Sequence, residues 1–144
     1  LGNPGNGKTH LLAAIGKIAQ AQNHTVIIRS VPALLKRFQQ TFGDGSHTNE
    51  SDLMDVLRDV ELLGLDDLGA EHGTPWAKSQ LYYLIDERYR FHKSVLVTSN
   101  ATLDELERRL ESRTLDRLCE MCDIVENKAP SRRMERAQAR RGGR

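Results

Sequence analysis

The chain has 144 residues, 28% of them charged, and a mean hydropathy of −0.55. These values favour one soluble domain, and no apolar run approaches the roughly 20 residues of a membrane span, which excludes a protein that crosses a membrane by helices. Residues 128–144 hold seven basic residues and the single acid Glu135, a net charge of +6 that leaves −5 for residues 1–127. We expect residues 134–144 to be a disordered tail that either contacts nucleic acid or is only solvated.

The first motif along the chain is the glycine-rich run Gly2-Asn3-Pro4-Gly5-Asn6-Gly7-Lys8-Thr9. Its spacing, G-x-x-x-x-G-K-[ST], is that of the Walker A loop, whose backbone N–H groups surround a phosphate. Lys8 brings a positive charge to the β- and γ-phosphates, and the hydroxyl of Thr9 is a ligand for Mg²⁺. A helical pattern over residues 9–20 adds a favourable dipole at the phosphate. The run therefore predicts a site for ATP and Mg²⁺.

A buried strand normally leads into such a loop, and here only Leu1 stands before it. We therefore expect a domain over residues 1–133 that is N-terminally truncated, with its first strand largely missing.

Beyond this loop, short β-branched or apolar runs alternate with helical patterns. The predicted strands cover residues 25–29, 60–67, 94–100 and 123–126, and the predicted helices cover 31–42, 50–59, a stretch from Pro75 past Tyr89, 102–111 and 114–121. Residues 43–49 are predicted to be a polar loop, and Ser30, Thr74 and Thr102 are predicted helix caps. This alternation predicts an α/β fold, a three-layer P-loop NTPase with a mainly parallel sheet covered on both faces. Ligands bind such sheets at the carboxyl ends of the strands.

Polar side chains stand at two of these ends. Asp66 and Asp67 close an apolar strand in the Walker B pattern, so Asp66 is expected to orient the Mg²⁺ shell and Asp67 to polarise a water against the γ-phosphate. Asn100 ends the next strand and is expected to hold that water or contact the γ-phosphate. The ordinary alternatives are turn or helix-cap residues.

Two further pairs leave alternatives open. Arg113 and Arg117 lie four apart on one predicted helix face, where they either pair with Glu111 and Asp116 or act as an arginine finger on a neighbour's γ-phosphate. Cys119 and Cys122 form a lone C-x-x-C, for which we expect reduced structural thiols rather than a zinc or redox site.

The chain resembles the AAA+ ATPases of the DnaC/DnaI helicase-loader and IstB transposition-helper group, from Gly2 to about Arg133. The resemblance is carried by GNPGNGKTHL at 2–11, LLGLDDLGAE at 62–71, LVTSN at 96–100 and ESRTLDRL at 111–118. It implies an AAA+ fold without a helical lid domain. It also implies that His10 belongs to the nucleotide-binding segment, that Asn100 is sensor 1, that Arg117 is the finger with Arg113 beside it, and that Arg133 is a sensor-2-like arginine.

The same resemblance implies that residues 31–42 are the family's extra helix, a region that touches single-stranded DNA. Phe42 either stacks on a base there or belongs to the core. Asp67 departs from the glutamate of many AAA+ proteins, which puts fast hydrolysis in doubt, and Glu71 is a weaker substitute.

These observations predict a cytoplasmic ATPase that converts ATP and water to ADP and phosphate, slowly unless assembly or DNA stimulates it. The resemblance implies a homo-oligomer with ATP between subunits, acting on single-stranded DNA as a loader of the replicative helicase, with no membrane partner. The alternatives are an IstB-like helper of a transposase, an ATP-gated DNA-binding switch with negligible turnover, and, least favoured, a small-molecule kinase.

Overall fold

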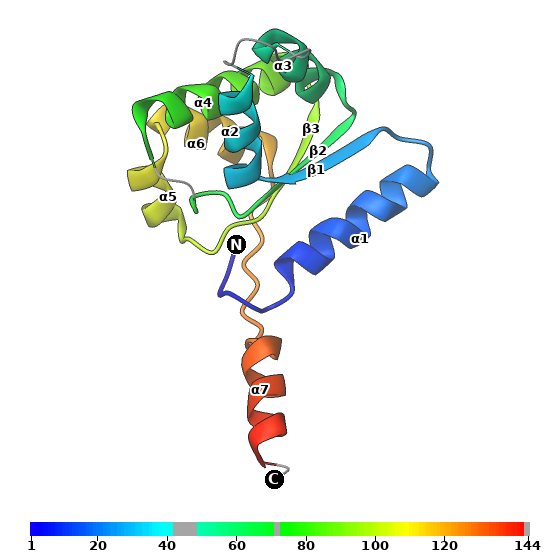
Figure 1. The fold of residues 1–144 in the computed structure, drawn as a ribbon, viewed down its shortest axis with the longest axis vertical. Coiled ribbons are helices and arrows are strands. Elements are labelled where there is room, and N and C mark those ends of the chain that lie inside the picture. Colours follow the sequence, from blue (N-terminus) through cyan, green and yellow to red (C-terminus); the bar gives the residue numbers. More distant parts are fainter. Residues whose placement is uncertain (42–48, 71–72, 143–144) are drawn as a thin grey trace.

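The computed structural model describes residues 1–41, 49–70 and 73–142, and its centre is a parallel sheet of three strands in the order β1-β2-β3 (Figure 1). The strands are β1 (Val26–Ser30), β2 (Leu62–Asp66) and β3 (Ser94–Val97). Val26 pairs with Leu62, and Leu62 with Ser94, so the carboxyl ends of all three strands meet at one edge. The predicted α/β architecture with a parallel sheet is confirmed.

Helices cover both faces of this sheet. α1 (Lys8–Ala21) lies against β1 and β2 on one face, and α2 (Val31–Gln40) and α4 (Pro75–Arg90) lie on the other (Figure 1). The remaining helices are α3 (Glu50–Asp59), α5 (Leu103–Arg109), α6 (Ser112–Met121) and α7 (Arg132–Gly142). No helix in these described stretches is long and apolar enough to cross a membrane.

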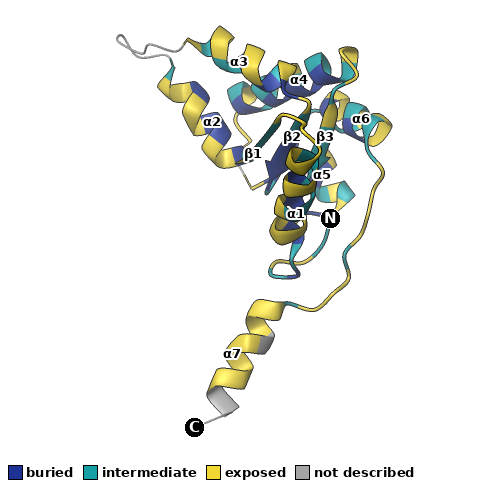
Figure 2. Ribbon diagram, turned by 90° about the vertical axis from the view of Figure 1, so that its right-hand side faces the viewer, coloured by how far each residue is buried: buried dark blue, intermediate teal, exposed yellow. Residues whose placement is uncertain are grey.

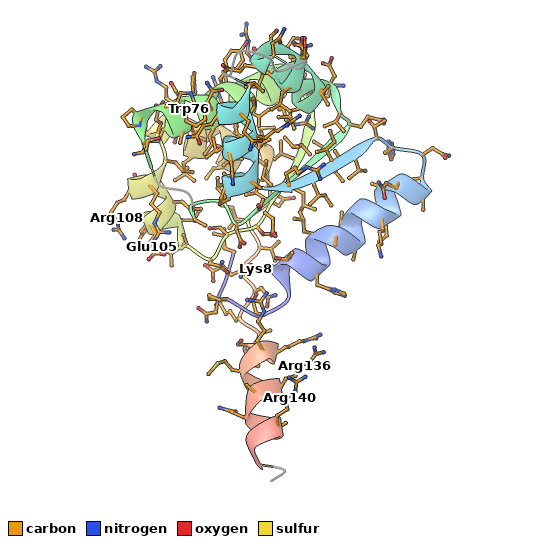
Figure 3. All side chains as sticks on the ribbon, in the orientation of Figure 1. Lys8, Trp76, Glu105, Arg108, Arg136 and Arg140 are labelled. Atoms are coloured by element: carbon orange, nitrogen blue, oxygen red, sulfur yellow. The ribbon has the colours of Figure 1, made fainter. Side chains whose placement is uncertain are left out.

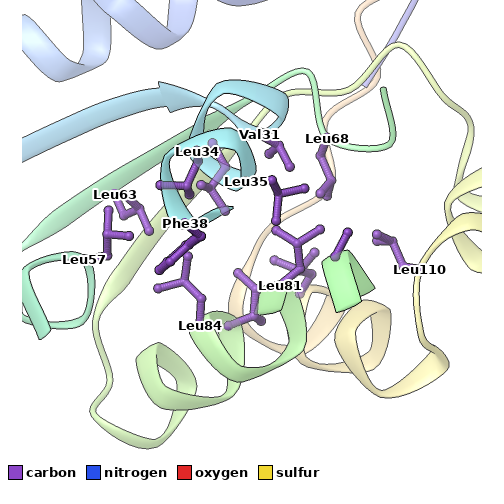
Figure 4. Packing of buried hydrophobic residues seen from close by; sticks show 14 of the residues in the cluster. Val31, Leu34, Leu35, Phe38, Leu57, Leu63, Leu68, Leu81, Leu84 and Leu110 are labelled. Atoms are coloured by element: carbon purple, nitrogen blue, oxygen red, sulfur yellow. The ribbon is translucent and has the colours of Figure 1, made fainter. Parts of the chain in front are cut away.

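The main core lies between the sheet and helices α2 and α4 (Figure 4). Alternate residues of β2, Leu63 and Leu65, point into it and are fully buried. Phe38 of α2 and Leu84 of α4 complete the same layer. Gly64, between the two leucines, faces α1, where a Cβ would lie 2.7 Å from Ile28 and 3.2 Å from Leu12. β2 is thus buried on both faces, which fixes the position of the carboxylates that follow it.

Most predicted elements are confirmed, with ends that differ by at most three residues. The predicted caps at Thr74 and Thr102 accept bonds from Ala77 N and Glu105 N, and the Glu105 carboxylate accepts a bond from Thr102 N in return. Ser30 precedes α2 but makes no side-chain cap bond. Phe42, Glu71 and most of the predicted loop 43–49 lie outside the described residues.

Two predictions were wrong. Residues 123–126 do not form a strand. In the described part of the chain, the neighbouring backbone is that of Leu1 and Gly2, and it forms one isolated parallel bridge, from Gly2 to Asn127. The basic segment predicted as disordered from 134 is instead mostly helical, since α7 spans Arg132–Gly142. The side chains at 132–134 and 136–140 are exposed, and α7 projects away from the sheet (Figure 2).

The N-terminal residues lie in a strand-like position at the free edge of β3. Gly2 N donates to Ser99 O at 3.2 Å, while Leu1 N donates to Val125 O and Asn127 N to Leu1 O, both at 2.7 Å. An apolar hollow of about 430 Å³ continues from Leu1 between α1, β3, α6 and residues 121–125. Residues 1 and 2 therefore join the end of β3 to the segment before α7.

A fully buried arginine holds the opposite ends of the strands. The guanidinium of Arg88, on α4, donates to five backbone carbonyls, those of Leu57, Arg58, Val60, Glu61 and Ser94, at 2.6–3.3 Å. These carbonyls end α3 and precede or begin β2 and β3. Burial lowers the pKa of Arg88 to about 10, so the side chain stays charged at neutral pH.

Replacing Arg88 with methionine removes the donors and leaves the five carbonyls without them. We expect the free energy of unfolding to fall by about 3 kcal/mol or more, because each unpaired buried carbonyl costs about 1 kcal/mol or more. Urea unfolding followed by circular dichroism measures the change. The control is Arg90→Met on the exposed side of the same helix, and equal unfolding midpoints for the two variants would contradict the role given to Arg88.

Candidate nucleotide-binding site

The glycine-rich run forms a tight loop that glycine alone permits. Gly2, Gly5 and Gly7 have φ values of 146°, 82° and 95°, in the region that side chains disfavour. A Cβ on Gly5 would lie 2.3 Å from Ser131 Oγ. Gly7 precedes α1 and has no side chain to cap it, so the first N–H groups of the helix are free to bind an anion. The loop therefore has the shape and the donors of a phosphate cradle.

Lys8 lies inside this cradle and is 9% exposed. Its Nζ donates to Gly2 O at 2.6 Å, Asn3 O at 2.8 Å and Asn6 Oδ1 at 3.1 Å, which ties the two halves of the loop together. Burial lowers the pKa of the Lys8 ammonium, while Asp67 and Asp66 oppose that shift. A phosphate entering the loop meets a cation that is already positioned by three acceptors.

Thr9 and Asp66 come together beside the loop, as the sequence predicted. Thr9 Oγ1 donates to Asp66 Oδ1 at 3.1 Å, and Thr98 Oγ1 donates to the same carboxylate oxygen. Asp66 is 9% exposed, at the carboxyl end of β2. A hydroxyl and a carboxylate oxygen next to a phosphate cradle are the hard oxygen donors that Mg²⁺ uses, so these residues fit that ion.

Asp67 and Asn100 form a second polar pair at the same edge. Asn100 Nδ2 donates to Asp67 Oδ1 at 3.0 Å, and Asp67 N donates to Thr98 Oγ1 at 3.2 Å. Asp67 has a φ of 57°, a left-handed conformation that turns the chain away from the strand direction of Asp66. The two carboxylates therefore face different partners, one toward Thr9 and one toward Asn100.

A pocket of about 790 Å³ contains most of the predicted nucleotide-binding residues. It is lined by Pro4 to Leu11, Ala13, Ala14, Asp67, Asn100, Arg132, Arg133 and Arg136. His10 and Arg133 thus lie at the pocket, while Asp66 is bonded to Thr9 outside the pocket lining. Arg132 and Arg136 were not predicted, although their spacing from Arg133 on one helix was visible in the sequence.

Arg113 and Arg117 lie away from this pocket, on α6. Arg117 Nε donates to Asp86 on α4 at 3.3 Å, its Nη1 lies 3.5 Å from Glu120, and its guanidinium lies 4.1 Å from the Tyr89 ring centroid. Its partners are therefore not the Glu111 and Asp116 weighed from the sequence. Arg113 is exposed. Neither arginine lines the nucleotide pocket of its own chain.

Asn127 completes the loop from the far end of the chain, and sequence reasoning missed it. Asn6 Nδ2 donates to Asn127 O at 2.7 Å, and Asn127 Nδ2 donates to Asn6 O at 3.1 Å. Each side-chain amide thus binds the other residue's carbonyl. The two residues are 121 positions apart, so no local pattern could reveal the contact.

We predict that Asn127→Ala weakens nucleotide binding about fivefold to tenfold, because removal of the amide leaves the buried Asn6 carbonyl unpaired and loosens the loop. Titration with a fluorescent ATP analogue measures the affinity. The control is Lys128→Ala, which changes the next residue along the chain, whose side chain is exposed. This variant is expected to bind the nucleotide like the parent chain. Unchanged affinity in Asn127→Ala would show that the amide pair does not support the loop.

Comparisons with known proteins agree with this geometry. A family model described as IstB-like ATP binding protein matches residues 1–140. The replicative helicase loader DnaC of Escherichia coli strain K12 is 29% identical over 117 residues, which cover 81% of this chain and 47% of DnaC. The chain spans about half, or less, of the length of the curated relatives it matches.

Solved structures give the same result. The crystal structure of the DnaC helicase loader matches with a TM-score of 0.78 at 27% identity, covering 88% of this chain and 75% of that one. AMPPCP-bound DnaA from Aquifex aeolicus has a TM-score of 0.78 at 22% identity, covering 99% of this chain and 44% of DnaA, which shows the shared fold alone. With the family match over nearly its whole length and a phosphate cradle of the required geometry, the chain belongs to the IstB-like ATP-binding family, within the DnaC/IstB group of AAA+ proteins.

Proposed function

We propose that this chain is the ATP-hydrolysing part of a loader for the replicative helicase. The observation that carries the proposal is the paired arrangement at one sheet edge, with Thr9 on Asp66 and Asn100 on Asp67 beside a Walker A loop. The resemblance to DnaC over most of the chain supports the choice of a helicase as the partner. The reaction converts ATP and water to ADP and phosphate.

The residues of the chain divide this work. Lys8 and the free N–H groups at the start of α1 hold the β- and γ-phosphates. Thr9 and Asp66 would hold Mg²⁺, which would supply positive charge against the phosphate charge that develops in the reaction. Asp67 accepts a hydrogen bond from the attacking water, and Asn100 keeps that carboxylate in position through its 3.0 Å bond.

The carboxylate of Asp67 is one methylene shorter than a glutamate. It therefore needs the water to approach closely, and we infer a slow basal rate that rises on assembly or on DNA.

We assign Arg117 to the nucleotide of a neighbouring subunit in a homo-oligomer. Its side chain is 36% exposed and lies outside the pocket of its own chain, so it serves a γ-phosphate only across a subunit boundary. The contacts with Asp86 and Tyr89 place the guanidinium against α4. Arg113, one helical turn earlier and exposed, lies beside it.

The wider assignments follow from the same relatives. Single-stranded DNA is proposed as the nucleic-acid partner and the cytoplasm as the location. Two alternatives use the same residues: a transposition helper, favoured by the family model's IstB-like description, and an ATP-gated switch with negligible turnover, favoured by the short Asp67 side chain.

We predict that Arg117→Ala binds ATP normally but loses at least 100-fold of the stimulated hydrolysis rate in the assembled complex. Single-turnover phosphate release measures the rate. The matched variant is Asp86→Ala, which removes the same hydrogen bond between α4 and α6 but keeps the arginine. If both variants lose activity equally, Arg117 acts by pairing helices and the finger assignment is wrong.

The choice among the three functions is tested by phosphate release from the intact chain alone, with single-stranded DNA, with a replicative helicase and DNA together, and with a transposase and DNA together. A loader is expected to be stimulated by helicase and DNA together, and Lys8→Ala is expected to abolish the signal because the phosphate charge loses its counterion. Stimulation by a transposase instead would favour the helper. No release above the Lys8→Ala background under any condition would favour the switch.

A further inference from the structure

One side of α7 carries a row of arginines that extends beyond the nucleotide pocket. Four residues, here called the arginine stripe, are Arg132, Arg133, Arg136 and Arg140. At about 100° per residue, they fall within an arc of roughly 100° on the helix surface. Arg136 and Arg140 project from the same side of α7 (Figure 3). We propose that the arginine stripe binds the phosphate backbone of single-stranded DNA without regard to base sequence.

The stripe is accessible, and no ion pair with it is found among the side chains that the structure describes. All four arginines are exposed, and α7 is joined to the rest of the chain at its first residue, where Arg132 N donates to Gly5 O at 3.1 Å. None of the ion pairs found among the described side chains involves a stripe arginine. The exposed guanidinium groups can thus be reached by an external anion.

The helix gains little from its own chain. Arginines at 132, 136 and 140 are spaced i, i+4, so the like charges repel along the same face. A helix of 11 residues whose described side chains, at 132–134 and 136–140, are all exposed is marginal in water. A row of phosphates along the stripe would neutralise the repulsion between the arginines and favour the helical form over the coil. A ligand with several negative charges in a row therefore suits the stripe.

The position of the stripe favours a nucleic acid over an acidic protein surface. Its first three arginines line the pocket beside the glycine-rich loop, and Arg140 continues the row beyond it. From Arg132 to Arg140 the helix rises about 12 Å, enough to meet several phosphates of one strand. Protein interfaces have an apolar centre, whereas the large hydrophobic residue of α7, Met134, points outside the arc of the stripe. Guanidinium forks match phosphate oxygens in pairs.

This proposal rests on the proposed function only for its choice of DNA strand, and its test needs no nucleotide. A labelled oligo-dT is titrated with the intact chain at several salt concentrations without ATP, and binding is followed by fluorescence anisotropy. The variant is Arg136→Ala/Arg140→Ala. The matched control is Arg90→Ala/Arg108→Ala, which removes two exposed arginines from α4 and α5.

We expect the stripe variant to bind at least tenfold more weakly at moderate salt. The slope of log affinity against log salt is expected to fall by about 1.4, or about 0.7 for each phosphate that an arginine no longer neutralises. The control is expected to match the parent chain, and oligo-dT and mixed-sequence strands are expected to bind alike.

Two outcomes would overturn the proposal. One is equal affinity and slope for the stripe variant and the control. The other is unchanged DNA binding with a changed sedimentation profile, which would assign the stripe to the acidic surface of a second copy. The stripe variant can lose DNA binding as expected while the parent chain shows no helicase-dependent hydrolysis. That result would contradict the loader function alone and would leave the DNA-binding role of the arginine stripe supported.

Discussion

Three parts of the chain meet at one carboxylate oxygen, Asp66 Oδ1. Thr9 reaches it from the first turn of α1, and Thr98 reaches it from the residue after β3, while Asp66 itself ends β2. These bonds fix the distance between the phosphate cradle and the edge of the sheet. The same threonine at 98 also accepts from Asp67 N, so the second carboxylate is placed by the same group. The geometry of the site therefore follows from where β2 ends.

β2 is held at its other end by the buried cation on α4. Arg88 gathers the carbonyls that lead into β2 and the first carbonyl of β3, so both strands start from a common point. Leu63 and Leu65 between the two ends pack into the main core. A strand clamped at both ends and buried on both faces has little freedom to shift its register. That rigidity is what a site built from hydrogen bonds of about 3 Å requires.

The sequence predicted the parts of the site that depend on local spacing. The glycine run, Asp66 and the Asp67–Asn100 edge were foreseeable because a parallel sheet brings strand ends together. Asn127 was not, because its partner Asn6 lies at the other end of the chain. The α7 helix was not predicted because a dense positive charge favours disorder, although arginine, alanine, methionine and glutamine all favour helices. The expected strand at 123–126 failed because strand formation depends on neighbours rather than on the segment's own residues.

The pairing of the two ends of the chain also governs the order in which the protein can mature. Asn6 and Leu1 reach their partners at 127 and 125 across nearly the entire sequence. Closing a loop of that length costs conformational entropy that must be offset by the sheet and core formed beforehand. During synthesis from the N-terminus, the cradle emerges before residues 125–127 and gains their support only afterwards. The phosphate loop is then the final part of the fold to become rigid, which ties nucleotide binding to completion of the domain.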